Sequence, residues 1–178
     1  MSHTLTTEHL VLQPVTAADQ AALLAHWTAP QVRRFMFDGA VLTAAGISEA
    51  IESSTASFQS FGYGLWLVRP REKGGLPVSE GGPLAGTAGL RPLENLGLEI
   101  IWSLAPDAQG RGYATEAARA VLDYALGPLG LPEVLAEIDE GNTASARVAE
   151  RLGMTAYAVV PGLLGPMTRY RTTASRPA

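Results

Sequence analysis

Apolar residues occur along this chain both in short runs and at helical spacing, and the two patterns follow one another in order. Runs at residues 10–12 and 65–68 predict short buried strands. Residues 84–90 and 98–104 predict two more strands, joined near residues 95–97 as an antiparallel hairpin. Three later strands are expected at residues 134–138, 157–160 and 168–171. The pattern therefore predicts six or seven strands.

Helical signals separate the first of these strands. Thr16 and Asp19 resemble a capping box that begins a helix extending through Trp27. A second helical turn begins at residues 29–32, and residues 47–58 carry apolar side chains at helical spacing. Two or three helices are expected before the strand at residue 65.

Two more helices are expected in the second half of the chain. Residues 114–125 form an apolar stripe at i, i+3 and i+4 spacing, and a compact helix follows at residues 145–152. Mixed strands and helices without an internal repeat predict an α/β fold in one domain, residues 1–178. We expect the glycine-rich connection at residues 70–83 to be mobile and the tail from about 173 to 178 to be disordered.

Composition excludes several classes of function. The net charge of −4 does not favour nucleic acid as a partner. The chain has no cysteine, and the spacing of His3, His9 and His26 does not suggest zinc, so we predict no metal site. Residues 154–167 are apolar but are broken by prolines and glycines, and no leader opens the chain. We therefore expect a cytoplasmic protein without a membrane partner.

Residues 104–114 carry the strongest chemical signal and read LAPDAQGRGYA. A strand here ends in a glycine loop that opens directly into a helix, which exposes main-chain N–H groups and the positive end of the helix dipole. This junction predicts an anion-binding loop, although two glycines could also serve only a tight turn. A dinucleotide-binding loop is disfavoured because Thr115 occupies its third glycine position and several strands precede the loop.

The spacing of Gln109, Gly112 and Ala114 resembles the Gln/Arg-x-x-Gly-x-Gly/Ala loop of GCN5-related N-acetyltransferases (GNAT), which binds the pyrophosphate of coenzyme A. Further similar segments occur in the family's order across nearly the whole chain, at residues 7–14, 29–36, 98–102, 109–117, 142–145 and 152–154. Several ordered matches are more specific than one glycine motif. Within this superfamily the chain most resembles the branch of the RimJ and RimL ribosomal-protein N-terminal acetyltransferases.

The resemblance implies a GNAT fold: a central mixed, mostly antiparallel sheet flanked by helices and splayed between strands 4 and 5 of the count above. It also implies acetyl-CoA as cosubstrate, with the main chain of Trp102 and Leu104 contacting the pantetheine arm and Arg111 at the solvent rim. The expected cofactor-binding residues are Trp102, Leu104, Gln109, Gly110, Arg111, Gly112, Tyr113, Ala114, Thr115, Asn142 and Ser145. Asn142 is also expected to cap the helix that follows it.

Acetyl transfer to an amine needs a base and a proton for the departing thiolate. Glu99 is the candidate base, because strand alternation places this carboxylate among apolar residues; pairing with an arginine such as Arg91 is the alternative. The resemblance assigns Ser145 as proton donor or thiolate stabiliser, although a packing role is as well supported. Many relatives have a tyrosine where this chain has Ala149, so Tyr157 is a second candidate acid, or simply a strand aromatic.

Acceptor contacts are expected from Phe35, Phe37, Trp66 and Glu99. Asp38 would favour a cationic acceptor but could equally be a turn former beside Gly39. The resemblance implies direct acetyl transfer, without a covalent intermediate, to a primary amine on a protein N-terminus or a small molecule, in a bacterial enzyme. A non-catalytic acyl-CoA-binding module is the alternative, and homodimer formation, common among relatives, is left open.

Overall fold

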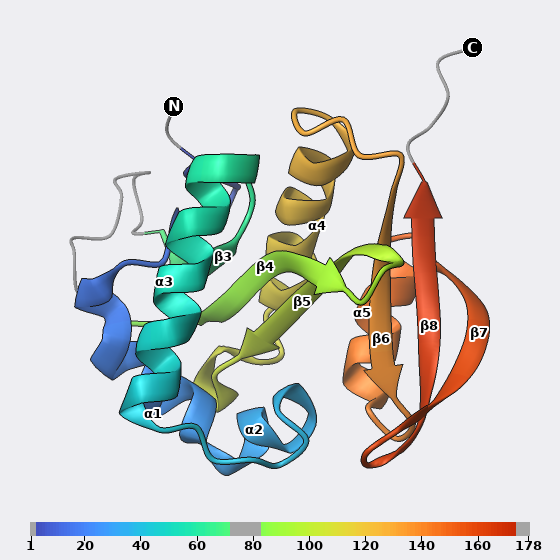
Figure 1. Ribbon diagram of the computed structural model, residues 1–178, viewed down its shortest axis with the longest axis horizontal. Coiled ribbons are helices and arrows are strands. Elements are labelled where there is room, and N and C mark those ends of the chain that lie inside the picture. The colour runs from blue at the N-terminus through green and yellow to red at the C-terminus, as the bar shows by residue number, and fades with distance from the viewer. Residues whose placement is uncertain (1–2, 72–82, 174–178) are drawn as a thin grey trace.

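The computed structural model describes residues 3–71 and 83–173. One sheet runs through these residues, with helices on both of its faces (Figure 1). The connection expected to be mobile and the expected disordered tail fall almost wholly outside the described residues; Thr173 still belongs to the last strand. No helix within residues 3–71 and 83–173 has both the length and the apolar character that crossing a membrane requires.

The sheet has eight strands in the order β1-β2-β3-β4-β5-β6-β8-β7. Their bounds are β1 Leu5–Thr6, β2 Leu10–Pro14, β3 Leu65–Pro70, β4 Gly86–Leu93, β5 Gly97–Leu104, β6 Glu133–Asp139, β7 Thr155–Gly162 and β8 Gly165–Thr173. The α/β class and the mixed, mostly antiparallel sheet are confirmed. The expected count was one strand short, because two residues of β1 are too few to show periodicity.

Five α-helices and two single 3-10 turns complete the described fold. Their bounds are η1 Ala17–Asp19, α1 Gln20–Thr28, α2 Pro30–Met36, α3 Ala44–Phe61, η2 Pro106–Ala108, α4 Tyr113–Leu126 and α5 Thr143–Arg151. The carboxylate of Asp19 accepts a hydrogen bond from the Thr16 N–H at 2.9 Å, as a capping box requires. The first turn is nevertheless 3-10, so the α-helix proper begins at Gln20.

The hydrophobic core has two parts, one on each face of the sheet. In β3, Trp66 and Val68 pack into the cluster that contains α4, whereas Leu65 and Leu67 pack into the cluster that contains α1 and α3. Because all four side chains are buried, β3 reads as one apolar run rather than as an alternating pattern. Helices therefore pack against both faces of β3.

The sheet is splayed at its centre, between β5 and β6. β4 and β5 are antiparallel and in register from Gly86↔Leu104 to Leu93↔Gly97. β5 and β6 run parallel and are paired only at Glu99↔Leu135. Beyond this pair the two strands diverge (Figure 1). These strands are numbers 4 and 5 of the sequence-based count, so the expected splay is present, and main-chain groups of both strands that a neighbour would otherwise engage face the gap.

Candidate active site

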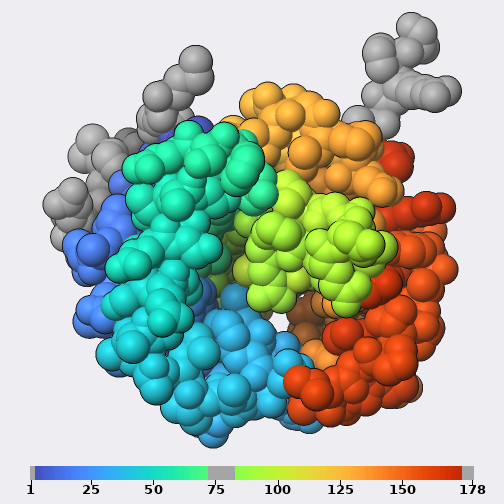
Figure 2. All heavy atoms as spheres, viewed as in Figure 1, coloured from blue at the N-terminus to red at the C-terminus, as the bar shows by residue number. Residues whose placement is uncertain are grey.

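A cleft of about 1110 Å³ lies where β5 and β6 diverge, and residues of both strands line it. The lining comes from α2 and the turn after it, from β4, β5 and β6, from the glycine loop with the start of α4, from α5 and from the β7–β8 hairpin. Figure 2 shows a hollow where α2, the β4–β5 hairpin and the β7–β8 hairpin meet. The cleft therefore connects the glycine loop to the far end of β5.

The glycine loop forms one end of the cleft and offers unpaired donors. Gly110 and Gly112 have φ angles of 75° and 79°, in the left-handed region that favours glycine, and nothing lies within 4 Å of where a Cβ would stand. Among the described residues, no main-chain or side-chain acceptor takes a hydrogen bond from any N–H of residues 110–115. The next amide, that of Glu116, donates to the carbonyl of Gly112 and begins the helical ladder of α4. Six successive N–H groups at a helix N-terminus are thus available to an anion.

The acidic residue in the first turn of α4, Glu116, is already engaged elsewhere. The carboxylate of Glu116 accepts hydrogen bonds from the Thr7 hydroxyl at 2.6 Å and the His9 N–H at 2.8 Å. Burial alone would raise the pKa of Glu116, but these hydrogen bonds hold it below its ordinary value. Glu116 ties the N-terminal strands to α4. Arg111 is exposed and does not line the cleft, as expected of a rim residue.

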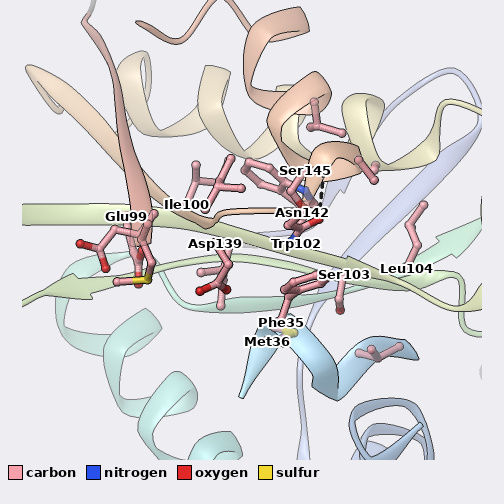
Figure 3. Close-up of a pocket in the computed structure, with 18 of the residues that line it drawn as sticks. Phe35, Met36, Glu99, Ile100, Trp102, Ser103, Leu104, Asp139, Asn142 and Ser145 are labelled. Atoms are coloured by element: carbon pink, nitrogen blue, oxygen red, sulfur yellow. Dashed lines mark hydrogen bonds between the residues drawn. The ribbon is translucent and has the colours of Figure 1, made fainter. Parts of the chain in front are cut away.

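The middle of the cleft lies between β5 and the start of α5. Trp102, Leu104, Asn142 and Ser145 line it (Figure 3). The Asn142 side chain accepts a hydrogen bond from the Ser145 N–H at 3.2 Å, so Asn142 caps α5 as predicted. The indole N–H of Trp102 is buried and has no partner among the described residues. Ala149 is buried in the core, so the tyrosine position of many relatives offers no polar group here.

Glu99 stands at the other end of the cleft and is the most buried carboxylate of the site. Its side chain is 4% exposed, and Oε1 accepts a hydrogen bond from Arg91 Nε at 2.7 Å. Its carboxylate also accepts a hydrogen bond from the main-chain N–H of Glu137, on β6. Burial raises the pKa of Glu99 above its ordinary value; Arg91 opposes this, and the nearby charge of Glu137 adds to it. The expected pairing with Arg91 is present, and the carboxylate is buried on the cleft wall; the role of Glu99 as the base stays a prediction.

Three acidic residues join Glu99 at this end of the cleft: Asp38, Glu137 and Asp139. Glu137 is paired with Arg169, whose Nε lies 2.6 Å from Oε1. Burial, and then the nearby charge of Asp38, raises the pKa of Asp139. One Asp139 oxygen is buried without a hydrogen-bond partner among the described residues. Asp38 has a φ of 52°, so it serves the turn and lines the cleft at once.

Sequence reasoning missed Glu137 and Asp139. Alternation along β6 was the available signal: Val134, Ala136 and Ile138 are buried in the core and leave residues 135, 137 and 139 on the other face. Only the splay beside β5 places that face on the cleft.

Three expected site residues lie away from the cleft. Trp66 is fully buried, and its indole N–H donates to the His3 carbonyl at 2.6 Å, so it is a core residue. Phe37 packs edge-to-face on Trp27, with ring centroids 5.2 Å apart. Tyr157 lies under Arg171 on the outer strand β7. Trp66 and Phe37 are therefore corrected to structural residues, and Tyr157 is not placed to donate a proton. Phe35 does line the cleft.

A buried hydrogen-bond network connects the cleft residue Ser103 to α1 and β4. Ser103 lines the cleft, and its hydroxyl lies 2.8 Å from His26 Nε2 and 2.8 Å from Thr87 Oγ1. His26 is buried, which lowers its pKa to about 4, so the imidazole is neutral at neutral pH. Trp27 completes the network through its indole N–H, 3.3 Å from Thr87 Oγ1. The network fixes α1 to the central strands.

A family model described as an acetyltransferase (GNAT) domain matches residues 9–155. The uncharacterized protein YkkB of Bacillus subtilis (strain 168) is 37% identical over 99 residues, covering 54% of this chain and 53% of YkkB. The chain thus spans about half the length of that relative. The uncharacterized N-acetyltransferase p20 of Bacillus licheniformis is 27% identical over 151 residues, covering 84% of this chain and 80% of p20.

Solved structures share the fold over nearly the full chain. An acetyltransferase from Agrobacterium tumefaciens has a TM-score of 0.78 at 29% identity, covering 95% of this chain and 93% of its own. RimL, a ribosomal L7/L12 alpha-N-protein acetyltransferase solved in complex with coenzyme A, has a TM-score of 0.78 at 14% identity, with 96% and 97% covered. YncA of Salmonella typhimurium, solved with acetyl-CoA, has a TM-score of 0.73 at 19% identity, with 95% and 96% covered. At these identities, RimL and YncA show likeness of fold alone.

Proposed function

This chain belongs to the GNAT acetyltransferase family, and from that premise we propose that it transfers the acetyl group of acetyl-CoA directly to a primary amine. One observation carries the proposal: the main-chain N–H groups of residues 110–115 have no acceptor among the described residues. The loop that carries them forms one end of a cleft whose other end holds the buried carboxylate of Glu99. Such a cleft suits a long ligand with an anionic end and a reactive end. YncA, of the same fold, was solved with acetyl-CoA.

The cofactor would lie along β5, with its pyrophosphate on the loop. The N–H groups of Gly110, Gly112 and Ala114 are the proposed pyrophosphate donors, with the Thr115 hydroxyl beside them in the first turn of α4. The exposed edge of β5, at Trp102 and Leu104, would pair with the pantetheine amides as a neighbouring strand would. Gln109, Tyr113 and Asn142 also line the cleft and complete the proposed contacts.

The chemistry asks Glu99 to remove a proton from the incoming amine. The neutral amine nitrogen then attacks the thioester carbonyl carbon and the C–S bond breaks. The acetyl group stays on nitrogen as an amide, and the second proton lost from that nitrogen ends on the departing thiolate, which leaves as the free thiol. Because burial raises the pKa of Glu99, its conjugate acid is better matched to a reaction near neutral pH than an exposed carboxyl would be. The Ser145 hydroxyl is the proposed hydrogen-bond donor to the departing thiolate.

The acceptor end of the cleft favours a cationic amine. Glu99 and Glu137 each have an arginine partner, whereas the structure shows no ion pair within the described residues for Asp38 or Asp139. A second ammonium group on the acceptor would meet these carboxylates. Comparing a diamine with the monoamine of equal length tests this: we expect the diamine to have the higher kcat/KM and Asp139→Asn to reduce that preference several-fold. Equal kcat/KM values in the wild type would contradict it.

We place the acceptor among protein N-termini and small amines, as the RimJ and RimL branch suggests. Offering acetyl-CoA with a panel of both kinds of acceptor and following free thiol tests the function. Thiol release that depends on the amine, with the acetyl group found on the amine by mass spectrometry, supports it. Tight binding of acetyl-CoA without turnover on any acceptor would favour the non-catalytic acyl-CoA-binding module. Failure to bind acetyl-CoA would contradict both. An acetylated side chain trapped during turnover would contradict direct transfer.

A further inference from the structure

Two arginine–glutamate ion pairs lie on opposite sides of the gap between β5 and β6, in a mirror-image arrangement. Arg91 on β4 and Glu99 on β5 are direct cross-strand partners, with Nε and Oε1 2.7 Å apart. On the other side of the gap, Glu137 on β6 and Arg169 on β8 are also direct cross-strand partners, 2.6 Å apart. Each pair places its glutamate next to the gap and its arginine one strand further out. The two carboxylates lie near enough for the charge of Glu137 to act on Glu99.

The pair on the β5 side is the more unequal in burial. The Glu99 side chain is 4% exposed, whereas the Arg91 side chain is 51% exposed. Arg169 and Glu137 are 19% and 14% exposed, so neither of them is as isolated from water as Glu99. A carboxylate as buried as Glu99 stays ionised only where donors and a positive charge compensate for the lost hydration.

Arg91 and Glu137 are the charged groups that act directly on Glu99, and further charged groups lie around them. Arg91 approaches from β4 and is the only cation in contact with Glu99 among the described residues. From β6 come the Glu137 N–H, which donates to Glu99, and the Glu137 carboxylate, which repels it. Arg169 on β8 is paired with Glu137, and Asp38 and Asp139 line the same end of the cleft. Arg91 is therefore the cation that offsets the buried charge of Glu99, whereas Arg169 is engaged by Glu137.

We propose that Arg91 is the positioning residue of the acceptor site: its guanidinium keeps the buried Glu99 ionised and fixes where the carboxylate lies on the cleft wall. This inference rests on the proposed function, because it concerns the base of that reaction. A protonated Glu99 cannot accept a proton from the amine, so the Arg91–Glu99 contact sets the lowest pH at which the site can work. Arg91 itself need not touch the acceptor.

The sign of the expected pH effect follows from the geometry. Burial and the Glu137 charge raise the pKa of Glu99, and Arg91 lowers it. Removing the guanidinium removes the lowering contribution, so Glu99 takes up its proton at a higher pH. We expect Arg91→Gln to move the acidic limb of the kcat/KM profile up by about one pH unit, because an opposite charge in contact typically shifts a carboxyl pKa by one to three. At pH values above the limb, kcat should recover most of its wild-type value.

Two further variants separate this role from a general loss of charge or of fold. Arg91→Lys keeps a cation at the position and should keep the limb within about half a unit of the wild type. Arg169→Gln breaks the mirror-image pair without touching Glu99 and should move the limb far less than Arg91→Gln. Thermal unfolding of all three variants shows whether they are folded. An Arg169→Gln shift as large as that of Arg91→Gln would overturn the proposal, since it would assign the effect to the overall field.

A readout that needs no turnover keeps this test distinct from that of the proposed function. The titration of Glu99 can be followed by carbon NMR of labelled glutamate, with Glu99→Gln identifying its signal. A higher titration midpoint in Arg91→Gln supports the inference, and an unchanged midpoint overturns it, whether or not any amine is acetylated. Absence of thiol release with every amine would instead count against the proposed function alone.

Discussion

The two halves of the cleft are built from different groups. From Trp102 to Thr115 all residues are described, and none of those that line the cleft carries a charge. The groups on offer there are main-chain N–H donors and uncharged side chains. At the other end the lining includes Asp38, Arg91, Glu99, Glu137 and Asp139. The first half can bind an anion without a lysine or arginine, because its donors belong to the backbone at a helix N-terminus.

This difference separates the binding of a cosubstrate shared by the whole family from the recognition of an acceptor that differs between its members. A main-chain loop presents the same groups whatever side chains surround it, so it suits a cosubstrate that a whole family uses. Side-chain charges at the acceptor end come from three strands and one turn and can change one at a time. We therefore expect substitutions in the loop to alter affinity for the cosubstrate and substitutions at the acceptor end to alter turnover and its pH dependence.

Replacing the proposed base should give the largest effect. We expect Glu99→Gln to lower kcat by roughly 10²-fold or more, in the range usual for a general base, with affinity for CoA nearly unchanged. Because the buried charge of Glu99 costs stability, the variant should unfold at the wild-type temperature or above it. Steady-state kinetics, calorimetric titration and thermal unfolding measure the three quantities.

The exposed Glu140, which follows β6 and does not line the cleft, provides the matched control as Glu140→Gln. It should keep the wild-type kcat. Unchanged kinetics in Glu99→Gln would remove Glu99 from the mechanism and break the division of roles between the two halves.

The network behind the acceptor half predicts an acid-sensitive fold. The unfolded chain protonates histidine near pH 6.5, whereas burial lowers the pKa of His26 to about 4 in the folded protein. Stability from this residue is complete above pH 6.5 and is lost as pH falls toward 4. Between pH 7.5 and 5 the loss should be about 2 kcal/mol. Urea unfolding of the wild type and His26→Gln at both pH values measures the difference, and equal pH slopes in the two proteins would exclude it.

The loop can be tested against a glycine of the same conformation elsewhere. Gly112 and Gly153 both have a φ of 79° and open space around a would-be Cβ, but only Gly112 lines the cleft. Alanine at either position should cost a similar backbone strain, on the order of 1 kcal/mol. Only Gly112→Ala should raise the dissociation constant of CoA, by about tenfold or more, as measured by calorimetric titration. Equal CoA affinity in the two variants would contradict the assignment of the loop.

Ser145 should show the smallest effect, because it belongs to the cofactor half and is assigned a single hydrogen bond to the departing thiolate. We expect Ser145→Ala to lower kcat about threefold to tenfold, which corresponds to one ordinary hydrogen bond. Thr143→Ala, two residues earlier on an exposed position of the same helix, is the control and should leave kcat unchanged. A decrease in kcat as large as that of Glu99→Gln would assign Ser145 as an essential acid and contradict the proposed division of roles between the two halves of the cleft.

The same contrast explains what the sequence could predict. The loop at residues 104–114 is contiguous, so its spacing alone identified the strand, the turn and the helix start. Glu99 was found from alternation within one strand. Asn142 was predicted as a cap, because a cap and the amide it serves are three residues apart. The splay came from the family resemblance, and its position is confirmed.

What could not be predicted depends on contacts between distant segments. Trp66 lies in an apolar run whose side chains are buried on both faces of the sheet. Such a run does not indicate whether a given side chain packs against a helix or lines a cavity. Phe37 looked equally available but packs on Trp27. Glu137 and Asp139 reach the cleft only because β6 lies beside β5 and diverges from it, which no local pattern reveals.

The central claim is that the backbone N–H groups of residues 110–115 bind the pyrophosphate of an acyl carrier. The most direct measurement compares calorimetric titrations with CoA and with pantetheine, which lacks the pyrophosphate, in the wild type, Gly112→Ala and Gly153→Ala. The account predicts that the wild type binds CoA at least about 100-fold more tightly than pantetheine, and that only Gly112→Ala narrows this gap. The same gap in all three proteins, or no gap in the wild type, would contradict it.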